Sequence, residues 1–140
     1  MGVLVENVSG RSFTELISPE ICATLSHGDL LAMEHAMIKS VDVRLISNGE
    51  MLGIAGVAPD TLLGVEAYLW LYANPFNERI STGVLRAGQQ IVNDFLAVYP
   101  RLVGYCEATN TKSQRWLRWM GARFAPSATT MIPFMIEARK

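Results

Sequence analysis

The stretch that decides the fold covers residues 66–124 and reads EAYLWLYANPFNERISTGVLRAGQQIVNDFLAVYPRLVGYCEATNTKSQRWLRWMGARF. It begins with an apolar strand, Glu66–Ala73, and passes through a loop into a helix predicted over Val84–Tyr99. A second strand follows at Arg101–Ala108, and then a short helix at Asn110–Gly121. A strand, a crossover helix and a second strand predict a parallel βαβ unit. Because a helix N-terminus offers free N–H groups to phosphate, we expect any chemical function there.

The composition describes one folded domain over residues 1–140. Half of the residues are hydrophobic and 18% are charged, which is enough apolar material for a core. The net charge is −1, so no overall field attracts the chain to nucleic acid or to an anionic membrane. One local group of basic residues alternates with Trp116 and Trp119. A solvated helix face is a simpler interpretation of this group than a nucleic-acid-binding surface. That group is Lys112, Arg115, Arg118 and Arg123.

The cysteines and the N-terminus favour a reducing compartment. Cys22 and Cys106 are far apart in the sequence and are interpreted as buried free thiols. No Cys/His spacing indicates a zinc site, so we expect no metal. The first residues lack a basic segment followed by an apolar one, and no apolar run approaches the ~20 residues that span a bilayer. A cytoplasmic protein without a membrane partner is expected.

The first half of the chain predicts two helices and a hairpin. Ser18-Pro19-Glu20 is a helix start, and the apolar spacing predicts helices over Pro19–Ser26 and over Asp29–Lys39, with Asp29 as the N-cap. Two β-rich runs on either side of Asn48-Gly49 predict an antiparallel hairpin. His27 and His35 lie on these helices and are assigned to surface or capping roles.

The chain ends with an apolar strand predicted over Thr129–Ile136. Pro133 cannot donate a ladder hydrogen bond, which indicates a sheet edge or a bulge. Residues 122–126 before it are a turn or a short strand. An exposed strand edge invites pairing, so this strand is the candidate contact of a homodimer, and the oligomeric state stays open.

The second half also carries the spacing Asn110-x-x-Ser113-x-x-x-Leu117-x-x-x-Gly121-x-x-Phe124. With the order of elements, it resembles the GCN5-related N-acetyltransferase (GNAT) family, in which a strand ends in Asn, a small residue follows three positions on, and the helix closes with Gly and an aromatic residue. The resemblance covers about residues 18–136. It implies an α/β (α+β) fold: a mixed, mostly antiparallel sheet with one parallel strand pair and flanking helices. The chain also resembles small GNAT-like proteins of tailed bacteriophages, some of which are virion components.

The resemblance implies acetyl-CoA, whose pyrophosphate the family binds on a loop of pattern Gln/Arg-x-x-Gly-x-Gly/Ala. Two registers stay open: Glu78-x-x-Ser81-x-Gly83 keeps small residues but has a carboxylate first, and Arg79-x-x-Thr82-x-Val84 keeps the charge but has branched side chains. An ordinary helix start capped by Ser81 or Asn74 is the alternative. The implied cofactor-binding residues are Tyr72, Ala73, Arg79, Ser81, Thr82, Gly83, Val84, Asn110 and Ser113.

Acetyl transfer to an amine needs an oriented thioester, a base for the amine and an acid for the departing thiolate. The family often takes the acid from a tyrosine after Leu117, where this chain has Arg118, and a guanidinium cannot act as an acid near neutral pH. The catalytic candidates are Glu66 as base, with Tyr72 and Tyr105 as hydroxyls at a notch between the parallel strands. A strand-end charge and half-buried packing tyrosines are the alternatives.

Two functions follow from the resemblance. The first is an acetyl-CoA-dependent N-acetyltransferase-like protein that acts on an amine acceptor of unknown identity. The second is a catalytically degenerate GNAT-fold binding protein, or a virion-associated one with virion proteins as partners, found in the host cytoplasm or the virion. Both depend on a notch where the two parallel strands separate near Tyr72 and Tyr105.

Overall fold

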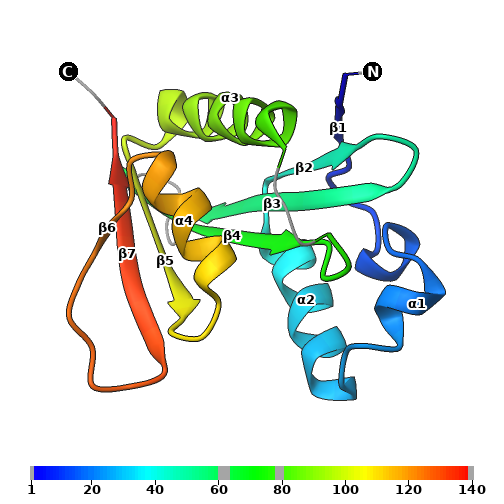
Figure 1. Ribbon diagram of the computed structural model, residues 1–140. Coiled ribbons are helices and arrows are strands. Elements are labelled where there is room, and N and C mark those ends of the chain that lie inside the picture. Colours follow the sequence, from blue (N-terminus) through cyan, green and yellow to red (C-terminus); the bar gives the residue numbers. More distant parts are fainter. Residues whose placement is uncertain (1, 60–63, 78–80, 139–140) are drawn as a thin grey trace.

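A computed structural model describes residues 2–59, 64–77 and 81–138. Within these residues one seven-stranded sheet has the strand order β1-β2-β3-β4-β5-β7-β6, with helices on both faces (Figure 1). The paired strands are antiparallel except for β4 and β5, which are parallel. The mixed sheet predicted from the sequence is therefore confirmed. The strands are β1 (Leu4–Asn7), β2 (Asp42–Ser47), β3 (Met51–Pro59), β4 (Glu66–Ala73), β5 (Arg101–Glu107), β6 (Arg123–Phe124) and β7 (Met131–Glu137).

The helices follow the order expected, with small shifts at their ends. They are the 3₁₀ turn η1 (Phe13–Glu15), α1 (Pro19–Cys22), α2 (His27–Lys39), α3 (Thr82–Val98) and α4 (Thr111–Trp119). Helix α1 starts as predicted, after the N-cap Ser18, but ends at Cys22 rather than Ser26.

The predicted N-cap of α2 is wrong by three residues. Ser26 is the N-cap and accepts a hydrogen bond from the backbone N–H of Asp29 at 3.0 Å. The Asp29 carboxylate accepts in return from the Ser26 N–H at 3.3 Å. This reciprocal capping box satisfies two N–H groups at once, and it therefore starts the helix earlier than a single Asp cap would.

The sheet separates two hydrophobic clusters. Helices α3 and α4 cover one face over Leu69, Phe95 and Trp116, while η1, α1 and α2 cover the other over Phe13 and Trp70 (Figure 1). The amphipathic spacing of α3 explains its placement, because its buried residues recur at helical intervals. Those residues are Val84, Gly88, Ile91, Val92 and Phe95.

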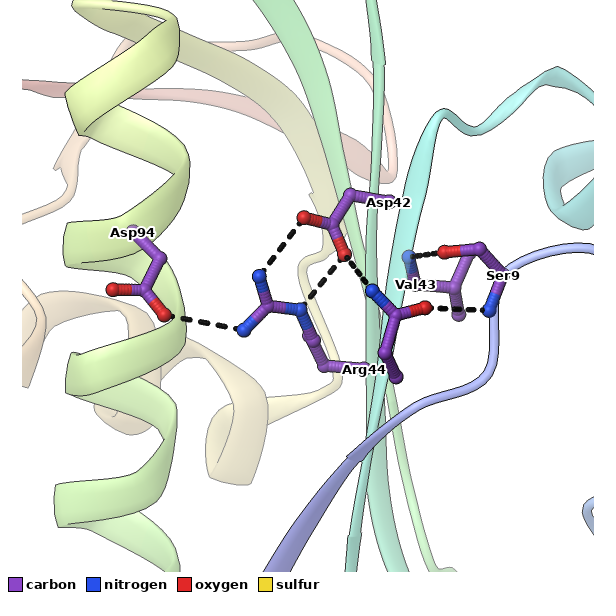
Figure 2. A network of polar contacts seen from close by, with 6 residues as sticks. Ser9, Asp42, Val43, Arg44 and Asp94 are labelled. Carbon is purple, nitrogen blue, oxygen red and sulfur yellow. Dashed lines mark hydrogen bonds and ion pairs between the residues drawn. The ribbon is translucent and has the colours of Figure 1, made fainter.

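A polar network ties α3 to strand β2. Figure 2 shows the Arg44 guanidinium between Asp42 and Asp94. Its Nε donates to Asp42 Oδ1 at 2.7 Å and its Nη1 to Asp94 Oδ2 at 3.1 Å. The hydrogen bond to Asp42 raises the pKa of Arg44. The guanidinium also lies 5.7 Å from the centre of the Phe95 ring. These contacts fix the position of α3 across the sheet.

The hairpin and the last strand agree with the sequence, with one qualification. Gly49 has φ of 76° in the β2–β3 turn, which is the conformation that favours glycine. Strand β7 pairs with β5 on one side and, at Phe134 and Met135, with the short β6 on the other. Because β6 covers part of that edge, less of it is open to a second subunit. The homodimer stays a prediction.

Candidate active site

The parallel strands β4 and β5 separate after a short paired segment. Their register ends at Tyr68↔Val103, although β4 continues to Ala73 and β5 to Glu107. The notch predicted from the sequence is therefore present, and it opens from Tyr68 onward. At its narrow end Gly104 is required, because a Cβ there would lie 2.5 Å from the carbonyl oxygen of Leu69. Tyr72 and Tyr105 belong to the parts of β4 and β5 that do not pair with each other, although each pairs with its other neighbouring strand.

The N-terminus of α3 presents its backbone to solvent. Ser81 is the N-cap, and its Oγ accepts from the Val84 N–H at 3.2 Å. Ser81, Thr82 and Gly83 are exposed, and with Val84 they line a hollow of about 530 Å³. The hollow also includes Glu50 from the β2–β3 hairpin, whose carboxylate disfavours an anion on that side. Arg79, the charged member of the predicted loop, lies outside the described residues.

Asn74 does not cap α3. Its side chain is buried, donates to the Met51 carbonyl at 2.7 Å and accepts from the Phe76 N–H at 2.9 Å. The amide therefore closes the turn that follows β4. Of the two caps considered from the sequence, Ser81 is the one the helix uses.

Lys112 crosses the open end of the notch. It belongs to α4, which follows β5, yet its ammonium donates to the carbonyl of Asn74, which follows β4, at 3.2 Å, and to the carbonyl of Asn77. Burial lowers the pKa of Lys112, and among the described residues no carboxylate forms an ion pair with it. The expectation of a solvated helix face is wrong for this residue. No local pattern signals the contact, because the partners are more than 30 residues away.

The motif residues at the start of α4 have a structural role. Asn110 is the N-cap, and its Oδ1 accepts from the Ser113 N–H at 3.1 Å. Trp116 is 1% exposed and packs against Gly53 and Gly88, while Trp119 is 50% exposed. The three-residue spacing of these two tryptophans favours one shared helix face against the core, yet only Trp116 is buried there. Trp116 lies beneath α3 and joins the two helices next to the notch.

The three predicted catalytic residues do not converge. The Tyr72 ring packs edge-on against Phe13, with centroids 5.3 Å apart, and burial raises the pKa of Tyr72. Tyr105 is 58% exposed. Glu66 lies at the paired end of β4, where its carboxylate is 3.4 Å from Arg101 Nη1. The structure thus separates them along the strands, and their catalytic roles stay predictions.

A second hollow opens on the other face of the sheet, where the notch begins. It has a volume of about 550 Å³ and lies between α2 and the strands β3 and β4. His35 and Lys39 line it from α2, and Tyr68 and Trp70 line it from β4. Burial raises the pKa of Tyr68, and nearby Tyr105 raises it further. Tyr68 is not among the site residues predicted above, although its two-residue spacing from Trp70 places both on one face.

Two absences hold for the described part of the chain. Outside residues 1, 60–63, 78–80 and 139–140, no group of three or more His, Cys, Asp or Glu residues could hold a metal ion. Over the same residues, no helix combines the length and the apolar character needed to cross a membrane.

Comparison with known proteins identifies the fold. No protein-family model matches the sequence, and no curated protein is similar to it by sequence. Solved structures are similar over nearly the whole chain. A GNAT-family protein from Desulfovibrio desulfuricans has a TM-score of 0.70 at 11% identity, over 97% of this chain and 99% of that one. The IAA acetyltransferase from Bacillus cereus has a TM-score of 0.68 at 9% identity, over 98% and 100% of the two chains.

A further similar structure contains the cofactor. The Campylobacter jejuni N-acetyltransferase PseH, solved in complex with acetyl coenzyme A, has a TM-score of 0.63 at 12% identity, over 98% of this chain and 99% of that one. The chain therefore has the GNAT fold. At these identities the similarity shows the fold alone, and the narrower resemblance to bacteriophage proteins finds no support in these comparisons.

Proposed function

We propose that the protein is an N-acetyltransferase that transfers the acetyl group of acetyl-CoA to an amine. The observation that carries the proposal is the separation of β4 and β5 after Tyr68 and Val103, beside an α3 N-terminus whose first residues are exposed. A notch between parallel strands accommodates an extended chain, and free N–H groups at a helix start bind phosphate. The acetyl-CoA bound to PseH, which has the same fold, supports this assignment.

The cofactor would be held from both sides of the notch. The backbone N–H groups of Ser81, Thr82 and Gly83 would bind the diphosphate, and the backbone of Tyr72 and Ala73 would orient the thioester arm. Val84, Asn110, Ser113 and the undescribed Arg79 complete the proposed set.

Lys112 adds a positive charge from outside the loop. Its ammonium rests on two carbonyl groups and has a lowered pKa. A diphosphate is a stronger partner for an ammonium than a neutral carbonyl, because the attraction between opposite charges adds to the hydrogen bond. We therefore expect the Lys112 side chain to leave the Asn74 carbonyl and contact the cofactor.

The acid would come from the tyrosines at the notch. The pKa of Tyr68 is raised by burial, so its hydroxyl stays protonated at neutral pH and can donate a hydrogen bond or a proton to the departing thiolate. Tyr105 and Tyr72 remain candidates for the same role. Glu66 precedes Tyr68 by two residues on the same face of β4, and it is the proposed base, with Arg101 as its present partner.

A calorimetric titration with acetyl-CoA tests the proposal. The wild-type protein should bind, and Lys112→Met should bind more weakly by about one to two orders of magnitude, since a charge-assisted hydrogen bond contributes about 1.5–3 kcal/mol. Arg115→Met, an exposed neighbour on α4, is the matched control. Pantetheine, which lacks the diphosphate, should not distinguish Lys112→Met from wild type. No binding at millimolar acetyl-CoA in either protein would remove the enzyme assignment.

A second candidate is a GNAT-fold binding protein without catalysis. The observation that favours it is the Lys112 side chain, whose ammonium donates across the end of the notch to the carbonyl groups of Asn74 and Asn77. This candidate predicts that the wild-type protein does not bind acetyl-CoA and that Lys112→Ala gains binding. The same titration therefore separates the two functions by the sign of the Lys112 effect.

A further inference from the structure

The hollow beneath α2 has the size of a small-molecule site and lies next to the start of the notch. Its volume of about 550 Å³ is within the range of small-molecule sites. Tyr68, which lines it, is also the last residue of β4 that pairs with β5. The floor of the hollow therefore reaches the point where the notch begins, on the face of the sheet opposite α3 and α4.

The polar side chains around this hollow favour an anionic group on the ligand. Lys39 and His35 are exposed, and they stand four residues apart, which places them on one side of α2. Within the described residues no carboxylate lines the hollow. Glu34, which neighbours His35 in sequence, is engaged elsewhere, because its carboxylate accepts from the Ser12 hydroxyl at 2.6 Å and from the Phe13 N–H.

The floor of the hollow is apolar and aromatic. Trp70 is 7% exposed, and its indole N–H is already satisfied by the Ser40 hydroxyl at 2.7 Å. Tyr68 is half-buried, and Ala58 and Pro59 add apolar surface. A ligand body that packs here gains from hydrophobic contact. A ligand that carries only positive charge would meet Lys39 without a compensating carboxylate from the described lining.

We propose that the acceptor is an amino acid with an apolar or aromatic side chain, bound with its carboxylate at Lys39 and His35, its side chain on Trp70, and its amine at Tyr68. The assignment rests on the proposed acetyl transfer. The neutral amine attacks the thioester carbonyl, a C–N bond forms and the C–S bond breaks. The proton lost by the nitrogen balances the one gained by the sulfur, so the products are an N-acetyl amino acid and coenzyme A.

Matched pairs of amines test the acceptor class. Release of free coenzyme A is measured with phenylalanine against phenethylamine and with tryptophan against tryptamine, with spermidine as a purely cationic acceptor. The kcat/KM of each amino acid should exceed that of its decarboxylated partner by about fivefold, the value of one partly exposed ion pair. Lys39→Gln should bring this ratio toward one, and Lys39→Glu should bring it below one. Arg86→Glu, the same charge change on α3, should leave the ratio unchanged.

A binding measurement makes the inference independent of turnover. Titration of N-acetylphenylalanine and N-acetylphenethylamine, followed by tryptophan fluorescence or by NMR, should show the same preference for the carboxylate and the same dependence on Lys39. Preferred binding of the carboxylate ligand without any acetyl transfer would support this pocket and refute the proposed function. Transfer to all amines alike, or a ratio that Lys39→Glu does not move, would overturn the acceptor class and leave the acetyltransferase assignment standing. Neither binding nor transfer would refute both.

Discussion

Substitution of Gly88 by alanine should destabilise the protein through one contact. Gly88 lies in the middle of α3, against the indole of Trp116. A Cβ at this position would lie 2.7 Å from both Cζ2 and Nε1 of that indole and 2.9 Å from Cε2. All three distances are shorter than contacts between non-bonded heavy atoms allow, so either the ring or the helix has to move.

The ring has little room to move. Trp116 is 1% exposed, and its far edge would lie 3.3 Å from a Cβ at Gly53 on β3. Overpacking of this kind costs about 1–3 kcal/mol, and we expect the upper part of that range because both sides of the ring are enclosed. Alanine in place of a helix-interior glycine stabilises the helix by about 1 kcal/mol through its higher helix propensity. The net loss in free energy of unfolding should be about 1–2 kcal/mol.

Urea denaturation followed by circular dichroism measures this loss. Gly83→Ala is the matched control, because it lies in the same helix and its added Cβ would meet only ordinary contacts, the shortest at 3.6 Å to Val3. It should be neutral or slightly stabilising. The m-value should be unchanged in both variants.

A double-mutant cycle identifies the contact as the cause. Trp116→Phe removes the three indole atoms that the new Cβ would meet, so Gly88→Ala should cost less in that background. Trp116→Phe should lower the free energy of unfolding by less than the lost side-chain volume alone predicts. The reason is that the buried Nε1–H has no hydrogen-bond partner among the described residues. If Gly88→Ala is as stable as wild type, or costs the same in both backgrounds, the reasoning is wrong.

Three further predictions concern a cap, an ion pair and a titration. Asn110→Ala should lower the free energy of unfolding by about 1 kcal/mol, whereas Asn110→Asp should not, because it keeps the acceptor for the Ser113 N–H. Equal losses for the two variants in urea denaturation would contradict a capping role. Arg44→Met should cost about 1 kcal/mol, and much of that loss should disappear in an Asp94→Asn background if the pair holds α3 to β2. Burial raises the pKa of Tyr72 above its ordinary value of 10.0. The contribution of Tyr72 to stability is therefore complete below that pH and is lost as the pH rises through its folded-state pKa. The urea midpoint of Tyr72→Phe should fall less steeply at alkaline pH than that of the wild type, and an equal slope would argue against the burial effect.

The sequence alone determined the order and type of the elements. Strand β4 has the predicted bounds, and β5 ends one residue before the predicted end. The buried residues of β5 alternate with the two-residue period of a strand, whereas β4 is a nearly continuous apolar run. The helix starts at Ser18 and Asn110 were also predicted from the sequence, because a capping side chain bonds to a backbone group only three residues away.

Only the tertiary structure decided the composition of the site. The packing of α4 against α3 decides that Lys112 contacts the Asn74 carbonyl and that Trp116 is buried but Trp119 is not. The position of α2 on the sheet decides that Tyr68 lines a hollow at the start of the notch. These contacts join residues that are distant in the sequence. Local periodicity carries no information about such distances, because they are set by the packing of whole elements against a shared core.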